Sequence, residues 1–145
     1  MIFYFDTSAL VKKYVWETGS QEVIGLWTQA EGISISKVGY AECLAAFQRK
    51  KREDEIAERQ LGRIIKTFRN DWTSFIRIDV SSELDKLIDR LVAKHPLRGF
   101  DAIHLASCLS LKTALKSHLA FVAADRGLLA AAAKERLVVH DVSRA

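Results

Sequence analysis

The chain contains little cysteine, little proline and no long apolar run. Only two of its 145 residues are cysteine and one is proline. Cys43 and Cys108 stand alone in apolar helical segments, so we expect small buried side chains and no disulfide. The sequence contains no C-x-x-C pair, which excludes the common redox and zinc motifs.

The longest uncharged apolar stretches, such as G-L-L-A-A-A-A, fall far short of the roughly 20 residues that span a bilayer. The N-terminus also lacks a basic segment followed by a cleavable apolar core. We therefore expect a cytoplasmic protein that makes no membrane contact. A hydrophobic content of 49% in 145 residues predicts a single domain over residues 1–145.

The net charge of +4 favours a polyanionic partner, because a basic field attracts nucleic acid whatever its sequence. The densest charged run is Q-R-K-K-R-E-D-E at residues 48–55. In one interpretation its basic half contacts nucleic acid. In the other, the run is a solvated helix face whose charges pair among themselves.

Short β-rich runs alternate with helical patterns along the chain. Strands are predicted over residues 2–5, 33–36, 75–78, 121–123 and 138–142, and a helix follows each of the first four. This alternation predicts an α/β protein whose parallel sheet is covered by helices on both faces.

The predicted helices differ in their patterns and caps. The first begins near Ser8, with Thr7 or Ser8 as its cap, and the long helical region over residues 39–68 suggests a protruding hairpin. Ser82 and Asp85 have the spacing of a capping box, and Pro96 ends the helix that follows. The segment 101–116 is apolar over most of its circumference, which predicts a central helix packed on both sides.

Three aspartates lie where an apolar stretch meets a predicted helix start. Asp6 follows M-I-F-Y-F, Asp101 lies inside L-R-G-F-D-A-I-H-L-A, and Asp125 follows A-F-V-A-A. Parallel sheets build their ligand sites at the carboxyl ends of strands, and carboxylates gathered there repel one another unless a hard cation such as Mg²⁺ is bound. Each aspartate taken alone also has a simpler interpretation as a helix cap.

Glu42 is the acid without such a capping role. It is embedded in the apolar segment G-Y-A-E-C-L-A-A-F near the start of the long helical region. Burial of an unpaired carboxylate is costly, so we expect a cation or a metal beside it.

Four segments carry a resemblance to a known family. D-T-S-A-L-V-K-K-Y at 6–14, Y-A-E at 40–42, L-R-G-F-D-A-I-H-L-A-S-C-L at 97–109 and F-V-A-A-D-R-G-L-L-A-A-A at 121–132 resemble the successive motifs of PIN-domain ribonucleases. The similarity is greatest to VapC-type toxins of type II toxin-antitoxin systems, and it covers nearly the whole chain in the order of that family.

The resemblance implies a three-layer α/β/α sandwich around a mainly parallel five-stranded sheet. It implies an active site formed by Asp6, Glu42, Asp101 and Asp125, which bind Mg²⁺ or Mn²⁺ and activate water against an RNA phosphodiester. Ser8 matches the D-x-S of the family, so its hydroxyl supports Asp6 or, in the other interpretation, caps the helix. The implied partners are RNA, a cognate antitoxin and a second copy in a homodimer.

The chain departs from the family pattern at two positions. Ala123 stands where many relatives have Thr or Ser, and Arg136 stands where many have Gly as the final helix turns into the last strand. His104 follows Asp101 by three residues, so a metal pair is conceivable, but the resemblance favours a packing role or a contact with a ligand residue. Lys12 and Arg126 are either phosphate contacts or solvated surface charges.

Two functions of different classes agree with these motifs. The first is a metal-dependent endoribonuclease that an antitoxin holds inactive. The second is a catalytically silent PIN-like module that binds RNA, or that acts with an antitoxin as a DNA-binding co-repressor. The intact set of four acids favours the enzyme.

Overall fold

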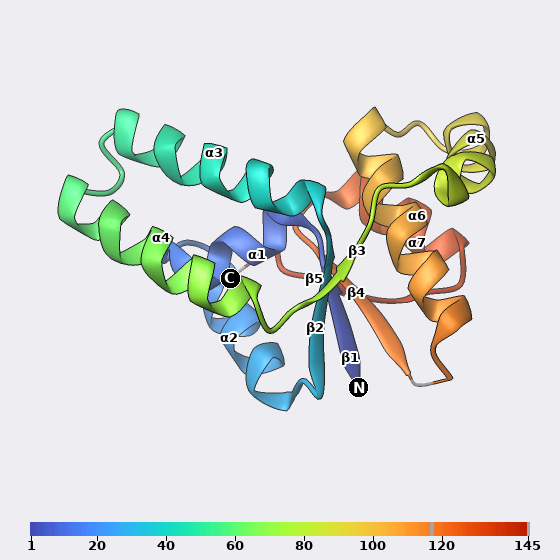
Figure 1. The fold of residues 1–145 in the computed structure, drawn as a ribbon, viewed down its shortest axis with the longest axis horizontal. Coiled ribbons are helices and arrows are strands. Elements are labelled where there is room, and N and C mark those ends of the chain that lie inside the picture. Colours follow the sequence, from blue (N-terminus) through green and yellow to red (C-terminus); the bar gives the residue numbers. More distant parts are fainter. Residues whose placement is uncertain (117, 145) are drawn as a thin grey trace.

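Five strands form one parallel sheet at the centre of the molecule (Figure 1). The computed structural model describes residues 1–116 and 118–144. The strands are β1 (Ile2–Phe5), β2 (Gly32–Ser36), β3 (Ile76–Ile78), β4 (Leu119–Ala123) and β5 (Val138–Asp141), in the spatial order β3-β2-β1-β4-β5. Each neighbouring pair is parallel, so the predicted parallel sheet is confirmed.

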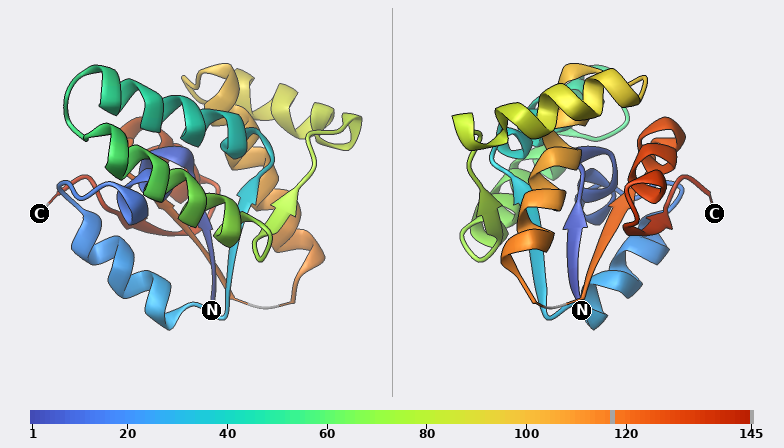
Figure 2. Two further views of the ribbon diagram at one scale, coloured as in Figure 1. Left: turned by 60° about the vertical axis from the view of Figure 1, so that its left-hand side comes forward. Right: turned by 90° about the vertical axis from the view of Figure 1, so that its right-hand side faces the viewer.

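Helices cover both faces of this sheet, as expected for a three-layer α/β/α sandwich (Figures 1 and 2). One layer contains α1 (Thr7–Tyr14), α2 (Ser20–Gln29), α3 (Val38–Arg52) and α4 (Glu58–Trp72), and the other contains α5 (Asp85–Lys94), α6 (Gly99–Ala114) and α7 (Arg126–Lys134). In the part of the chain that the structure describes, no helix is both long enough and apolar enough to cross a membrane.

The central strand β1 divides its side chains between the two layers. Phe3 and Phe5 join the core under α1 to α4, whereas Tyr4 stacks on Phe121 in the core under α5 to α7. Strand side chains alternate between the two faces of a sheet, so an apolar run such as I-F-Y-F stabilises both cores at once.

The predicted helical hairpin is formed by α3 and α4, which project together from the sheet (Figure 1). Its aromatic side chains face inward, since Phe47 and Phe68 are fully buried and pack edge-on against Tyr14 of α1. The large apolar side chains of this hairpin and of the end of α1 thus contribute mostly to the core. Val15 is also buried, and Trp16 alone remains 74% exposed.

Two helix starts differ from the sequence prediction. Asp6, rather than Thr7 or Ser8, caps α1, because its extended backbone lets its side chain accept the Ala9 N–H at 3.2 Å. Ser82 forms no capping box; it begins a 3₁₀ turn (Ser82–Leu84) that leads directly into α5. That turn satisfies the first backbone donors in place of a side chain.

Arg136 adopts a left-handed backbone conformation, with φ of 67°. It lies two residues after the end of α7, where the chain turns toward β5. Glycine is favoured at such positions because a Cβ atom is strained there. Arg136 thus occupies a position whose backbone conformation favours the Gly that many relatives have there.

The side chain of Glu135 ties α5 to the end of α7. It is 6% exposed and contacts His95 at 2.7 Å, Arg90 at 2.9 Å and Lys94 at 3.1 Å. Partial burial opposes ionisation of this carboxyl, but hydrogen bonds from His95, Lys94 and Arg90 outweigh it and lower its pKa to about 2.

Because the pKa of Glu135 is lower in the folded chain than its ordinary value, the ionised carboxylate stabilises the fold above about pH 4.5, and this stabilisation is lost as the pH falls toward 2. We predict that Glu135→Gln lowers the free energy of unfolding by about 1–3 kcal/mol at pH 7 and by much less at pH 3. Urea titrations at the two pH values measure the difference. The exposed Glu83→Gln is the control, and a pH-independent loss at Glu135 would contradict the electrostatic explanation.

Candidate functional site

The four acids singled out in the sequence line one pocket. Asp6, Glu42, Asp101 and Asp125 all contribute to a cavity of about 500 Å³, together with Ser8. The structure thus brings together residues that lie up to 119 positions apart in the chain.

The topology explains why the acids meet. Asp6 directly follows β1, and Asp125 follows β4 after one intervening residue. From β1 the chain runs to β2 and β3 on one side and returns to β4 and β5 on the other, so β1 and β4 flank the point where the strand order reverses. Ligand sites of open α/β sheets form at the carboxyl ends of strands at such a point. Glu42 reaches the pocket from α3, and Asp101 from the first turn of α6.

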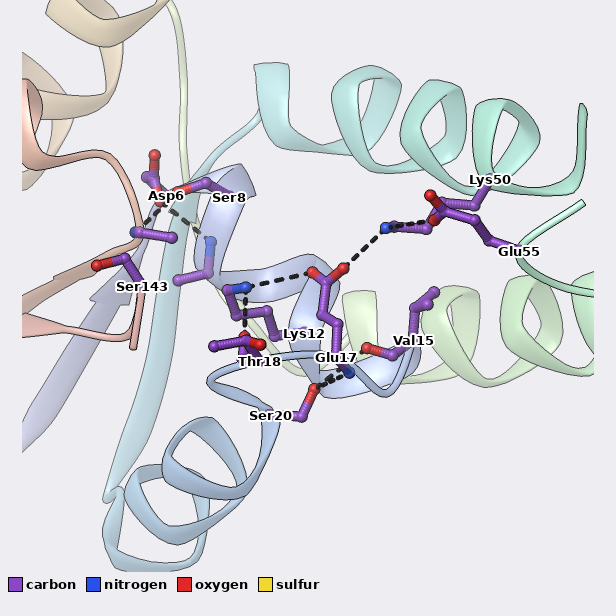
Figure 3. A network of polar contacts seen from close by, with 12 residues as sticks. Asp6, Ser8, Lys12, Val15, Glu17, Thr18, Ser20, Lys50, Glu55 and Ser143 are labelled. Atoms are coloured by element: carbon purple, nitrogen blue, oxygen red, sulfur yellow. Dashed lines mark hydrogen bonds and ion pairs between the residues drawn. The ribbon is translucent and has the colours of Figure 1, made fainter. Parts of the chain in front are cut away.

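Asp6 is held by its own helix start and by Ser8. Its Oδ1 accepts the Ser8 hydroxyl at 2.6 Å and the Ala9 N–H at 3.2 Å. The Ser8 oxygen in turn accepts the N–H of Ala124 at 3.0 Å, which connects β1 to the loop after β4. Figure 3 shows Ser8 directed toward Asp6. The serine therefore supports the aspartate and does not cap the helix.

Asp125 also combines a capping role with a place in the pocket. Its Oδ1 accepts the Leu128 N–H at 3.0 Å, while its Oδ2 lies 3.9 Å from the guanidinium of Arg98. Arg98 is 87% exposed and also stands 3.8 Å from Asp101. The capping interpretation and the site interpretation are thus compatible, because each uses a different carboxylate oxygen.

Glu42 is oriented by a buried hydrogen-bond chain that the sequence did not predict. Its Oε1 accepts from the Thr7 hydroxyl at 2.7 Å and from His104 Nε2 at 2.7 Å. Tyr4, whose oxygen accepts the Ser36 N–H, lies 2.7 Å from His104 Nδ1. Burial raises the pKa of Tyr4, and the chain of contacts from Tyr4 through His104 to Glu42 connects β1, α6 and α3.

His104 accordingly contacts a site acid, as the resemblance favoured, and does not form a metal pair with Asp101. The partners that we expected for Glu42 were a cation or a metal, and the structure provides a hydroxyl and an imidazole. Burial opposes ionisation of Glu42, but the hydrogen bonds from His104 and Thr7 outweigh it and lower its pKa.

Asp6 and Asp101, in contrast, are destabilised in their ionised forms. Burial raises the pKa of Asp6 to about 6, and the charge of Asp101 adds to this effect. Burial and then the charge of Asp125 raise the pKa of Asp101. The pocket therefore accumulates negative charge that the fold only partly compensates.

The donor set suits a hard cation. The four acids offer only carboxylate oxygens, the ligands that Mg²⁺ prefers, and the buried cysteines contribute none. Among the residues that the structure describes, no three acid, histidine or cysteine side chains lie close enough together to hold a metal ion by themselves. An arrangement of this kind fits an ion that retains several water ligands, as Mg²⁺ does.

Basic side chains line the opposite part of the same pocket. Lys12, Arg49 and Lys50 contribute to it, and Glu17 lies among them. Lys12 is 9% exposed, so it is not an ordinary solvated surface charge, whereas Arg126 is exposed at the start of α7. The charged run at 48–55 is divided: Lys50 faces the pocket, and Lys51 pairs with Glu58 at 3.1 Å.

The sequence model of the PIN-domain family matches residues 3–135 of this chain. The chain therefore belongs to the PIN-domain family, in agreement with the resemblance seen in the motifs. It is similar to Ribonuclease VapC45 from Mycobacterium tuberculosis, with 31% identity over 110 residues that cover 76% of each protein.

Two solved structures share the fold. VapBC2 from Rickettsia felis, bound to a DNA fragment from its promoter, has a TM-score of 0.63 at 14% identity and covers 97% of this chain and 98% of that one. A toxin-antitoxin complex from Klebsiella pneumoniae has a TM-score of 0.61 at 18% identity, with coverage of 84% and 85%. These likenesses establish the α/β/α architecture.

Because the pKa of Asp6 is higher in the folded chain than its ordinary value of 3.8, ionised Asp6 opposes folding, and the metal-free protein loses stability as the pH rises from about 4 through 6. We predict that Asp6→Asn raises the free energy of unfolding at pH 7 by about 1–3 kcal/mol in chelator. The gain should disappear near pH 4. Urea titrations measure it, and a destabilised Asp6→Asn protein at pH 7 would contradict the assigned strain.

Proposed function

We propose that this PIN-domain protein is a metal-dependent endoribonuclease that hydrolyses RNA phosphodiester bonds, and that it is the toxin of a toxin-antitoxin pair. The observation that carries the proposal is the convergence of Asp6, Glu42, Asp101 and Asp125 on one pocket at the carboxyl edge of the sheet. The similarity to Ribonuclease VapC45 supports the RNA substrate. We also propose a cytoplasmic location, because the substrate is RNA.

The same four acids would hold Mg²⁺ or Mn²⁺, since they supply hard oxygen donors and uncompensated negative charge. The bound cation supplies positive charge at the scissile phosphate and activates water near neutral pH. Asp6 and Asp125 each commit one oxygen to a helix cap, which leaves the other available in the pocket.

The remaining polar residues position these acids. Ser8 restrains Asp6 and joins it to the β4–α7 loop. Thr7 and His104 fix the Oε1 atom of Glu42, so that its second oxygen is oriented toward ligand or water by a rigid chain that begins at Tyr4. Arg98 stands at the rim, where its guanidinium attracts a phosphate toward Asp101 and Asp125.

An antitoxin is the proposed protein partner. Two of the structural neighbours are a toxin-antitoxin complex and VapBC2. A strongly anionic pocket without metal accepts a basic side chain from such a partner, and Arg98 demonstrates that a guanidinium fits beside Asp101 and Asp125. The antitoxin thus inhibits by taking the place of the cation.

The proposed activity is tested by Asp101→Asn. This change keeps the size of the side chain but removes one of the charges that hold the cation, so we expect RNA cleavage with Mg²⁺ or Mn²⁺ to fall by at least about 100-fold. Wild-type cleavage should also stop in chelator and return when Mn²⁺ is added in excess. Gel analysis of a labelled single-stranded RNA measures both effects.

Cleavage by Asp101→Asn at the wild-type rate would contradict the site assignment. If the wild type binds RNA but cleaves none with either metal, the result would favour the catalytically silent module. Circular dichroism of the variant provides the control for folding.

We further propose a homodimer. The outer surface of α5 and α6 carries an apolar patch formed by Ile88, Phe100 and Ile103, and Phe100 is 58% exposed. An exposed aromatic side chain within an apolar patch is typical of an interaction surface.

Phe100→Asp should therefore convert the protein to a monomer, because a charge in the patch must be desolvated on association. Trp16→Asp is the matched control, since Trp16 is even more exposed but lies outside the patch. Light scattering at micromolar concentration distinguishes the two variants. A wild-type monomer, or a Phe100→Asp dimer, would contradict this proposal.

A further inference from the structure

A single carboxylate separates two largely buried lysines in the basic part of the pocket (Figure 3). Glu17 Oε1 lies 3.3 Å from the Lys12 ammonium, and its Oε2 lies 2.8 Å from that of Lys50. The side chains of Lys12 and Lys50 are only 10% and 15% exposed, whereas Glu17 is 31% exposed. The two cations thus come from different helices, α1 and α3, and meet at Glu17, while Lys50 also pairs with the half-exposed Glu55 at 3.1 Å.

The backbone presents Glu17 at this position. Its N–H donates to the Ser20 hydroxyl at 2.9 Å, and that hydroxyl donates to the carbonyl of Val15 at 3.2 Å. Lys12 is anchored separately, because its ammonium also donates to the Thr18 carbonyl at 2.6 Å. The lysine positions therefore do not depend on the Glu17 carboxylate alone.

Two lysines with so little exposure are an uncommon feature of a pocket wall. Partial burial of an ammonium is costly unless an anion accompanies it. Glu17 supplies that anion from a loop between α1 and α2, it lies between the two lysines (Figure 3), and it is more exposed than either of them. A phosphate oxygen satisfies the same two donors as a carboxylate oxygen does, and it adds negative charge.

We propose that Lys12 and Lys50 form a second phosphate subsite, which binds an RNA backbone phosphate next to the scissile one, and that Glu17 occupies this subsite until RNA displaces it. The inference rests on the proposed function. It follows from the shared pocket, since the four acids line one part of the cavity and the lysine pair lines the other. An RNA strand that places one phosphate at the acids brings a neighbouring phosphate to the lysines.

Glu17 then acts as an internal competitor of the substrate. Removal of the Glu17 charge should strengthen RNA binding, whereas removal of either lysine charge should weaken it. A purely structural ion pair predicts instead that loss of Glu17 destabilises the protein and leaves RNA affinity unchanged.

Glu17→Gln and Lys50→Gln test the subsite. Both are made in the Asp101→Asn protein in chelator, so that no RNA is cleaved, and fluorescence anisotropy measures the affinity for a short labelled single-stranded RNA. Glu17→Gln should bind RNA about three- to tenfold more tightly at low salt, and Lys50→Gln about three- to tenfold more weakly. Lys50→Gln should also reduce the slope of log affinity against log salt by about 0.7, which corresponds to one lost phosphate contact.

Lys51→Gln is the matched control, because Lys51 is the next residue of α3 but pairs with Glu58 outside the pocket. It should change the affinity by less than about twofold. An RNA of the same sequence with uncharged backbone linkages should bind the parent and its variants with equal affinity, because the subsite then has no phosphate charge to bind.

If Glu17→Gln and Lys50→Gln both bind RNA with the affinity of the parent and melt at its temperature, the proposed subsite is wrong. If the wild type cleaves RNA with Mn²⁺ while both variants bind as the parent does, only the subsite is wrong. If the wild type neither binds nor cleaves RNA, the proposed function itself fails. Should Lys50→Gln fail to fold, the isosteric Glu17→Gln decides the question alone.

Discussion

The burial of carboxylates at the carboxyl edge of the parallel sheet is the constraint on which the rest of this molecule depends. The strand order β3-β2-β1-β4-β5 reverses beside β1, and this topology directs Asp6 and Asp125 to the same edge. Burial raises the pKa of Asp6 to about 6, so the metal-free fold carries a charge that it would be more stable without. The metal-free protein is thus less stable than it would be with a neutral Asp6, and the same negative charge favours a cation in the pocket.

Polar support around the pocket keeps the acids fixed despite the cost of their burial. Ser8 holds Asp6, and the chain from Tyr4 through His104 holds Glu42. In both cases the protein uses one carboxylate oxygen, and we propose that the other binds the ligand. The basic wall opposite, with Glu17 between Lys12 and Lys50, complements the acids and gives the pocket two regions of opposite charge. A polyanionic substrate that carries a cation at one phosphate matches both regions.

Local patterns in the sequence predicted much of this architecture. The apolar runs ended by Asp6 and Asp125 specify both the strands and the edge at which the acids gather, because a run that is buried on both faces is typical of a central parallel strand. The alternation of short β-rich runs with helical patterns was equally informative, and every predicted strand is present in the described residues.

Contacts between distant segments were not predictable in the same way. The hydrogen bond from Tyr4 to His104 joins residues 100 positions apart, and it depends on how α6 crosses the sheet. The bridge from Glu17 to Lys50 depends likewise on where the α3–α4 hairpin lies against α1. The cap of α1 was predicted at Thr7 or Ser8, one or two residues after Asp6, because all three are good capping residues and only the backbone conformation distinguishes them.

The claim that the four acids form a cation site is tested most directly by calorimetric titration of Mn²⁺ into the metal-free protein. The account predicts that the wild type binds Mn²⁺ and that Asp6→Asn and Asp125→Asn each weaken binding by at least about tenfold. Asp89→Asn, which changes an exposed acid of α5, should bind as the wild type does. No Mn²⁺ binding by the wild type, or equal binding by all three variants, would contradict it.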